Sequence, residues 1–150
     1  MASTNWSISE ATKAEVTKIV AGINEFNEQQ VPASHPTWTP IELAISDDHG
    51  ELIGGLLGGV GCWGGLEIKI LWVAERYRAE GLGSKLLEKA EAVATAQGAT
   101  HAMLDTFDFQ ARDFYLKKGY TIAGEITGFP AGHTRYYCYK KLTEALDQVS

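Results

Sequence analysis

Residues 71–84 read LWVAERYRAEGLGS and carry the pattern that decides the fold. An apolar strand through Val73 passes into a basic turn, which two glycines interrupt before a helix begins. Gly81 and Gly83 have no side chains to keep a ligand from the backbone, and the first N–H groups of a helix attract anions. The stretch predicts either a phosphate-binding loop or a plain strand-to-helix turn, and glycine spacing alone does not decide between the two.

The composition predicts one compact domain spanning residues 1–150. Of its residues, 45% are hydrophobic and 21% charged, and no linker-like tract or repeat divides the chain. The N-terminus lacks the features of a signal peptide and no window is long and apolar enough for a membrane span, so we expect a cytoplasmic protein with no membrane partner. The two cysteines have no metal-like spacing, so we expect no metal site. The net charge of −6 disfavours a nucleic-acid surface and favours a cationic partner.

In the first third of the chain, a short strand is expected at residues 4–8. A helix is expected from about Glu10 to Asn27, with Ser9 as its N-cap and one apolar stripe facing the core. Residues 31–40 hold three of the four prolines and predict an irregular loop.

Antiparallel pairing is expected between residues 41–46 and 51–60. The seven glycines between residues 54 and 65 predict bulges, or a backbone that lies close to another group. Residues 66–73 alternate as a strand, LEIKILWV. Strict alternation puts one set of side chains on one face, Leu66, Ile68, Ile70 and Trp72, and the other set on the opposite face, Glu67, Lys69, Leu71 and Val73.

The second half predicts a helix over residues 83–97 and then a strand over residues 100–106, parallel to the preceding strand if the helix is a right-handed crossover. A short helix is expected to start at Asp108 or Gln110 and to end at Gly119. Residues 120–126 and 135–142 predict a terminal hairpin. The total is about seven strands and at least three helices.

Two motifs in this order resemble a known family. Residues 78–83, RAEGLG, fit its phosphate loop, Arg/Gln-x-x-Gly-x-Gly/Ala, and residues 111–120, ARDFYLKKGY, fit its later helix, Ala-x-x-x-Tyr-x-x-x-Gly-Phe/Tyr. Over about residues 41–142 the chain therefore resembles the GNAT acetyltransferase superfamily. The resemblance implies an α+β fold whose mixed, mostly antiparallel sheet has about seven strands, with splayed parallel strands 4 and 5 and helices on both faces.

The resemblance implies that acetyl-coenzyme A (acetyl-CoA) binds in the gap between the splayed strands. The backbone of the Leu71, Trp72 and Val73 segment would run along the pantetheine arm. The pyrophosphate would be held by the loop and the first turn of the helix, Arg78, Ala79, Glu80, Gly81, Leu82, Gly83 and Ser84. Asp108 stands where the family usually has Asn, and because a carboxylate cannot donate a hydrogen bond as an amide does, a cofactor contact at this position is an open question.

Acetyl transfer requires a neutral amine, whereas an alkyl amine with a pKa near 10.4 is almost wholly protonated at pH 7. Glu67, eleven positions before Arg78, resembles the general base of the histone-modifying branch. Two alternatives remain: Glu67 pairs with Lys69 or a cross-strand neighbour, or water relays the proton. From the residues alone, Tyr115 on a short amphipathic helix is more typical of a core aromatic than of a catalyst. The resemblance reverses this preference, because Tyr115 occupies the family's general-acid position.

The leading hypothesis is an acetyl-CoA-dependent N-acetyltransferase that acts in a ternary complex on a primary amine, with a small molecule favoured over a protein. The alternatives are a non-catalytic acyl-CoA-binding or sensor domain and a protein N-terminal or lysine acetyltransferase. A nucleotide-binding module is disfavoured because residues 78–84 lack the Gly-Lys-Ser/Thr ending of a P-loop. The sequence leaves the acceptor amine and the oligomeric state open, a homodimer included.

Overall fold

The computed structural model describes residues 3–143. The chain divides into two compact units, residues 1–33 and 34–150, which are treated separately below. Within residues 3–143, none of the helices combines the length and the apolar character needed to cross a membrane.

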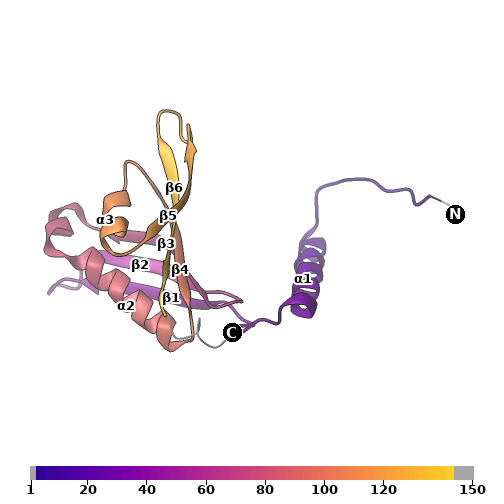
Figure 1. The fold of residues 1–150 in the computed structure, drawn as a ribbon, viewed down its shortest axis with the longest axis horizontal. Helices are drawn as coiled ribbons and strands as arrows, with labels where there is room; N and C mark the ends of the chain where they lie inside the picture. The colour runs from indigo at the N-terminus through magenta and orange to yellow at the C-terminus, as the bar shows by residue number, and fades with distance from the viewer. Residues whose placement is uncertain (1–2, 144–150) are drawn as a thin grey trace. The chain divides into compact units, whose positions relative to one another are not determined.

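The N-terminal unit holds one helix, α1, over Lys13–Gln30 (Figure 1). A capping box starts it: the Thr12 hydroxyl accepts a hydrogen bond from the Glu15 N–H, and the Glu15 carboxylate accepts one from the Thr12 N–H, each at 3.2 Å. The helix therefore begins later than predicted and its N-cap is Thr12 rather than Ser9. Residues 3–12 form no regular secondary structure, so the strand predicted at 4–8 is wrong; the described part of this unit holds no strand with which it could pair.

The second unit is built on a six-stranded mixed sheet in the order β1-β2-β3-β4-β6-β5. All neighbours are antiparallel except β3 and β4, which are parallel. The prediction of a mixed, mostly antiparallel α+β fold is confirmed, with six strands in the described residues rather than seven because residues 4–8 do not contribute one. The strands are β1 (Thr39–Ser46), β2 (Leu52–Val60), β3 (Gly65–Val73), β4 (His101–Phe107), β5 (Thr121–Thr127) and β6 (Thr134–Lys141).

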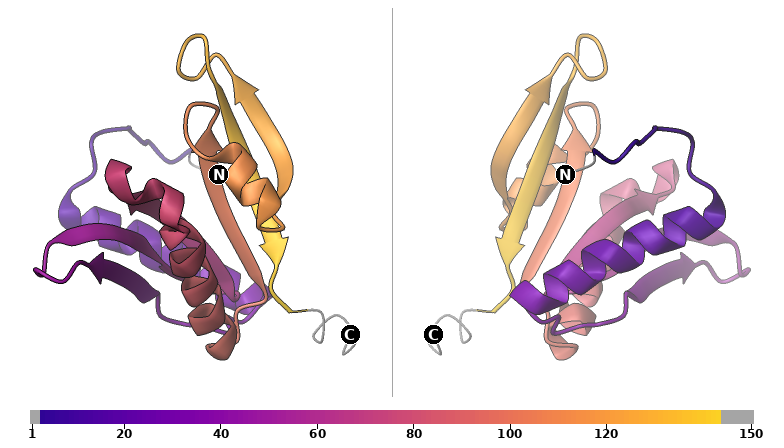
Figure 2. Two further views of the ribbon diagram at one scale, coloured as in Figure 1. Left: turned by 90° about the vertical axis from the view of Figure 1, so that its left-hand side faces the viewer. Right: turned by 90° about the vertical axis from the view of Figure 1, so that its right-hand side faces the viewer.

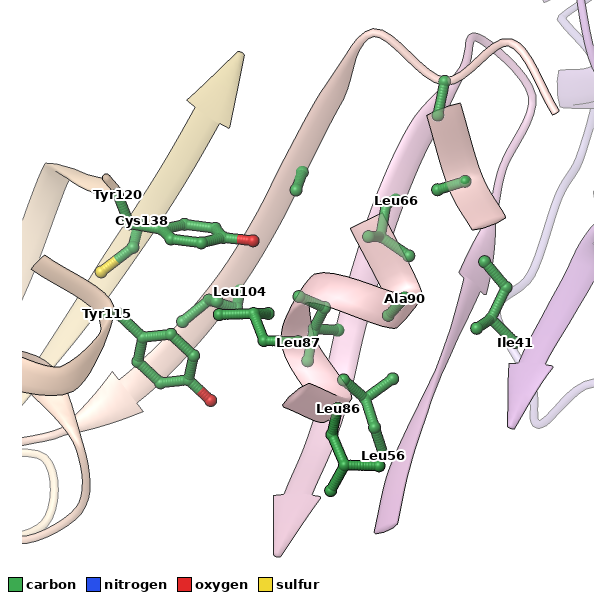
Figure 3. Packing of buried hydrophobic residues seen from close by; sticks show 14 of the residues in the cluster. Ile41, Leu56, Leu66, Leu86, Leu87, Ala90, Leu104, Tyr115, Tyr120 and Cys138 are labelled. Carbon is green, nitrogen blue, oxygen red and sulfur yellow. The ribbon is translucent and has the colours of Figure 1, made fainter. Parts of the chain in front are cut away.

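Two α-helices of this unit, α2 (Leu82–Ala96) and α3 (Arg112–Lys117), cover one face of the sheet (Figure 2), and a short 3-10 helix, η1 (Glu75–Glu80), precedes α2. The core lies beneath them, where Leu86 and Leu87 of α2 pack on the buried side chains of the strands. Tyr115 and Tyr120 close the core on the side of α3 and β6, as Figure 3 shows. Buried apolar side chains of this kind each contribute about 1.5–3 kcal/mol relative to exposure.

The glycines of β2 allow close approach, as the sequence predicts. A Cβ atom on Gly58 would collide with the backbone oxygen of Glu67, and one on Gly59 would collide with the indole ring of Trp38. A register shift also falls between Leu57 and Gly58. Both features that the glycine run predicts, a bulge and a nearby backbone, are therefore present.

The bulge corrects the predicted faces of β3. Leu57 pairs with Ile70 and Gly58 with Ile68, so Lys69 is the extra residue and alternation restarts after it. Leu71 and Val73 consequently pack against the core, on the same side as Leu66 and Ile68. Glu67 lies on the opposite face together with Ile70 and Trp72. The prediction that it shares a face with Leu71 and Val73 is therefore wrong.

Candidate active site

A gap opens between β3 and β4 because the two parallel strands pair over only three residues. These pairs are Gly65 with His101, Leu66 with Ala102, and Glu67 with Met103. Beyond them the strands diverge, and Figure 2 shows the group β1–β3 fanning away from the group β4–β6. A cleft of about 440 Å³ fills the gap on the side of α2 and α3, and it is lined by the second half of β3, the end of β4, Arg78 and the start of α3.

The edge of β3 that faces this cleft carries backbone groups that pair with no neighbouring strand. The Ala74 N–H donates to the Ile53 oxygen of β2 at 2.8 Å, so alternate residues, Val73 and Leu71, direct their N–H and C=O groups to the other side. No residue of β4 pairs with them in the described part of the chain. The Arg78 Nε donates to the Val73 oxygen at 2.9 Å, which places the guanidinium group at the mouth of the cleft.

Gly81 makes the turn from η1 into α2. Its φ of 75° is left-handed, a conformation that favours glycine, and α2 begins at the next residue. The first i→i−4 bond of α2 runs from the Lys85 N–H to the Gly81 oxygen, so the preceding amides, of Leu82, Gly83 and Ser84, point outward from the helix end. This is the arrangement of an anion site, and η1 carries Arg78, Ala79 and Glu80 beside it.

Tyr115 reaches the cleft from α3. Its side chain is buried, it lines the cleft, and its hydroxyl makes no hydrogen bond to any described residue. Burial, together with the nearby Cys138 and Asp105, raises the pKa of Tyr115 to about 12. A phenol with this pKa stays protonated at neutral pH and can donate one hydrogen bond into the cleft.

Glu67 stands where the strands begin to separate, on the face opposite α2. It is the last β3 residue paired with β4, and its carboxylate makes neither a salt bridge nor a hydrogen bond within residues 3–143. The predicted alternative, an ion pair with Lys69, is absent from the structure, because the Lys69 Nζ lies over the Trp38 ring at 4.6 Å from its centroid.

A second cleft, of about 620 Å³, opens on the face that carries Glu67. Its walls combine carboxylates with aromatic and sulfur-containing side chains, among them Glu67, Asp105, Tyr137, Tyr139 and Met103. The two clefts share three lining residues, Ile68, Lys69 and Asp105, so they meet within the gap between β3 and β4.

Comparison with known proteins identifies the family. The model of the acetyltransferase (GNAT) family matches residues 10–120. The chain belongs to the GNAT acetyltransferases.

Individual relatives agree with this assignment. Blasticidin-S acetyltransferase of Streptomyces morookaense is 42% identical over 96 residues, which are 63% of this chain and 70% of that protein. An acetyltransferase of Agrobacterium fabrum strain C58 is 30% identical over 101 residues, 67% of this chain and 73% of the relative. The crystal structure of an acetyltransferase from Bacillus cereus ATCC 14579 is 30% identical and superposes with a TM-score of 0.81, covering 91% of this chain and 97% of that one.

As a GNAT enzyme the protein is an acetyl-CoA-dependent N-acetyltransferase. The groups of the cleft also fit acetyl-CoA chemically, because the edge of β3 that pairs with no strand offers backbone partners to the amides of a pantetheine arm. The helix start after Gly81 offers donors to a pyrophosphate, and Arg78 offers a positive charge. Of the residues predicted to bind the cofactor, Leu71, Trp72, Val73 and Arg78 line the cleft, and residues 79–84 follow Arg78 without lining it.

Asp108 departs from the predicted set. Its Oδ1 lies 2.8 Å from His133 Nδ1 and its Oδ2 accepts from the Thr134 N–H at 3.0 Å, so both oxygens are engaged with the β5–β6 hairpin, and the residue does not line the cleft. Desolvation raises the pKa of Asp108, but the hydrogen bonds from His133 and Thr134 outweigh it and leave the pKa lowered. The structure therefore places Asp108 with the hairpin rather than with the cofactor cleft.

Gln110, which the sequence did not single out, lines the cleft instead. Its Oε1 accepts from the Phe107 N–H at 3.0 Å, which holds the side chain over the end of β4 and leaves the amide NH2 free to donate. Asp105 and Arg135 were also missed as a pair. Alternation along each strand shows which face a side chain lies on. Only the β4–β6 register, which no local pattern specifies, shows that Asp105 and Arg135 are neighbours.

Proposed function

We propose that the enzyme acetylates the primary amine of a small molecule, by direct attack of the amine on acetyl-CoA within a ternary complex. The junction of the two clefts carries the proposal. Because they share Ile68, Lys69 and Asp105, a donor in one cleft and an acceptor in the other would meet without an enzyme-bound acetyl group.

Glu67 would receive the proton that the amine loses, directly or through water. Its carboxylate lines the acceptor cleft and has no partner among the described residues, so it is available as a base. The amine nitrogen forms a bond to the acetyl carbon while the carbon–sulfur bond breaks. A backbone N–H near Val73, on the free edge of β3, would stabilise the carbonyl oxygen, and Tyr115 would donate a hydrogen bond to the departing thiolate.

The choice of a small molecule rests on two observations. The acceptor cleft has a volume of about 620 Å³, within the usual size range of small-ligand sites. One relative that is 42% identical to this chain over 96 residues is a blasticidin-S acetyltransferase. The negative net charge of the chain adds a weak preference for cationic acceptors.

The test is thiol release from acetyl-CoA with a panel that contains blasticidin S, spermidine, an aminoglycoside and lysine-containing and N-terminal peptides. We expect turnover with at least one small amine, intersecting initial-velocity lines and no mass gain of the protein on incubation with acetyl-CoA alone. Binding of acetyl-CoA without turnover on any amine would favour a sensor domain. Turnover confined to peptides would favour a protein acetyltransferase.

The role of Glu67 has a matched control in Glu42, a glutamate on β1 that lines neither cleft. Glu67→Gln should lower kcat by roughly 10²–10⁴-fold at neutral pH, the range for a general base, and Glu42→Gln should leave it unchanged. Equal rates for the two variants would remove Glu67 from the mechanism and leave water as the proton acceptor.

A further inference from the structure

Asp105 and Arg135 form an ion pair beside the gap in the sheet. The Arg135 Nε lies 2.9 Å and its Nη2 2.8 Å from the same carboxylate oxygen, Oδ2 of Asp105. The other oxygen, Oδ1, has no partner in the described part of the chain. One oxygen is thus used to fix the carboxylate, and the other remains available to a ligand.

Three aromatic rings hold the guanidinium group of Arg135 in place. Its carbon lies 5.3 Å from the ring centroids of Phe107 and Tyr137 and 5.6 Å from that of Phe129. Cation–π contacts of this kind favour a guanidinium position among the rings. These contacts favour the position of Arg135 in which it orients Asp105.

Asp105 also occupies a special place, because it lines both clefts. On β4 it lies two residues beyond Met103, the partner of Glu67, and therefore on the same face as Glu67, further along the widening gap. An acceptor amine in contact with Asp105 would lie at the junction, next to the cofactor cleft.

We propose that Asp105, oriented by Arg135, binds the acceptor amine in its ammonium form and keeps hold of it as Glu67 takes the proton. The proposal rests on the proposed function and names the acceptor class: alkylamines that are protonated at neutral pH. Arylamines and the exocyclic amino groups of nucleobases, which are neutral at that pH, are excluded as reacting groups. Arg135 acts through Asp105 and is a positioning residue.

The carboxylate oxygens of the acceptor cleft that have no partner support this class. Its lining carries two carboxylates, Glu67 and Asp105, and one cation, Lys69, whose ammonium group lies over Trp38. Arg135 is bound to Oδ2 alone, so Oδ1 of Asp105 and the carboxylate of Glu67 both await a donor. A cationic amine offers several charge-assisted N–H donors to such oxygens, whereas a neutral arylamine brings no charge to the site.

The experiment compares Asp105→Asn with Asp48→Asn, a matched change in the turn between β1 and β2. Spermidine and blasticidin S serve as acceptors in steady-state kinetics. Calorimetry with spermidine and free CoA measures acceptor binding without turnover. We expect Asp105→Asn to raise the KM and Kd of the amine by about 10- to 100-fold, as for a lost hydrogen bond to a charged group, with kcat and acetyl-CoA affinity little changed. Asp48→Asn should behave as the wild type.

Arg135 is tested through non-additivity. Arg135→Gln should raise the KM of the amine, Arg135→Lys should rescue part of the loss, and Arg135→Gln combined with Asp105→Asn should be no worse than Asp105→Asn alone. Melting curves and acetyl-CoA binding establish that each variant is folded.

The outcomes separate the two proposals. If the wild type acetylates no small amine, the proposed function fails and this inference fails with it. If the wild type acetylates spermidine or blasticidin S but Asp105→Asn leaves the KM and Kd of the amine unchanged, only the inference is overturned. Wild-type turnover of aniline as efficient as that of spermidine would also overturn it.

Discussion

The hydroxyl of Tyr115 faces a cleft from a buried ring, and this position decides what it can do. An alkyl thiol has a pKa near 8.5, whereas burial raises that of Tyr115 to about 12. Full proton transfer to a thiolate would therefore be uphill by about 3.5 pKa units, on the order of 5 kcal/mol. A hydrogen bond from the neutral phenol to the thiolate has no such cost. In the proposed mechanism, Tyr115 would therefore act as a hydrogen-bond donor to the leaving group rather than as a complete proton donor.

Tyr115→Phe should therefore lower kcat by about 10- to 100-fold, the effect of one hydrogen bond to a charged group, and leave acetyl-CoA affinity within about twofold. The pH profile of wild-type kcat should show no alkaline fall due to Tyr115 below about pH 11, because the phenol stays protonated there. Stopped-flow thiol release and equilibrium binding measure the two quantities. An unchanged kcat in Tyr115→Phe would assign the ring to the core alone.

At this scale, sequence patterns located residues better than they oriented them. Tyr115, Arg78, Leu71 and Val73 were placed by motif and position, and the structure brings all four to one cleft. The face of Glu67 was wrong, because a one-residue bulge at Lys69 reverses every side chain after it, and no local composition marks where a bulge falls.

Among the elements, the turn from η1 into α2 depends on one backbone conformation. Gly81 has a φ of 75° and open space around its Cβ position, so Gly81→Ala would be strained by conformation alone, at a cost of about 1–2 kcal/mol. Gly83, inside the first turn, has an ordinary φ, and a Cβ there would meet the Phe114 ring at a normal 3.6 Å. Gly81→Ala should lower the melting temperature and Gly83→Ala should not. Equal melting temperatures would contradict the role given to Gly81.

Helix α1 offers a second test at this scale. Thr12→Ala removes the capping hydroxyl and leaves the Glu15 N–H without its partner, which should cost about 0.5–2 kcal/mol of helix stability. Hydrogen exchange in the first turn of the intact chain should become faster, with the last turn unaffected. Ser9→Ala, at the cap position first expected, is the control and should have no effect on exchange.

The boundaries of this helix also show where sequence patterns fall short. Apolar periodicity finds a helix but not its first residue, and Thr12-Lys13-Ala14-Glu15 is a capping-box signature that competes with Ser9. The helix continues to Gln30 and ends just before Pro32, because a residue that precedes proline, here Val31, disfavours helical geometry. Strands β1, β2, β3 and β4 lie within two residues of their expected bounds, since alternation and flanking glycines agree there.

For the whole molecule, buried tyrosines make stability depend on alkaline pH. Below pH 10, Tyr115 is protonated in both the folded and the unfolded chain and contributes no pH dependence. Between pH 10 and 12 the unfolded chain loses this proton and the folded chain does not, so the free energy of unfolding falls. Two pKa units correspond to about 2–3 kcal/mol at pH 12. Burial raises the pKa of Tyr120 as well, and its hydrogen bond to Glu91 acts in the same direction.

The measurement is urea unfolding at pH 9 and at pH 11. The wild type should lose stability between these values, and Tyr115→Phe, which has no proton to lose, should lose less. A loss of the same size in both proteins would mean that Tyr115 is solvated in the folded state.

The topology of the second unit was within reach of sequence reasoning, since a crossover helix implies parallel neighbours and tight turns imply antiparallel ones. The face proposed to bind the acceptor was not within reach of sequence reasoning. It is assembled from β3, β4, β5 and β6, whose side chains meet only when the register is known, and it is this register that pairs Asp105 with Tyr137 and brings Arg135 beside them.

The separation of β3 from β4 has one more consequence, which concerns how the two products leave the enzyme. The two clefts lie on opposite faces of the sheet and share lining residues where the strands part. If they hold donor and acceptor as proposed, each product would have its own exit and would not need to wait for the other to leave. A molecule made by joining CoA to an acceptor would have to pass through the gap between β3 and β4, so we expect it to bind and dissociate slowly.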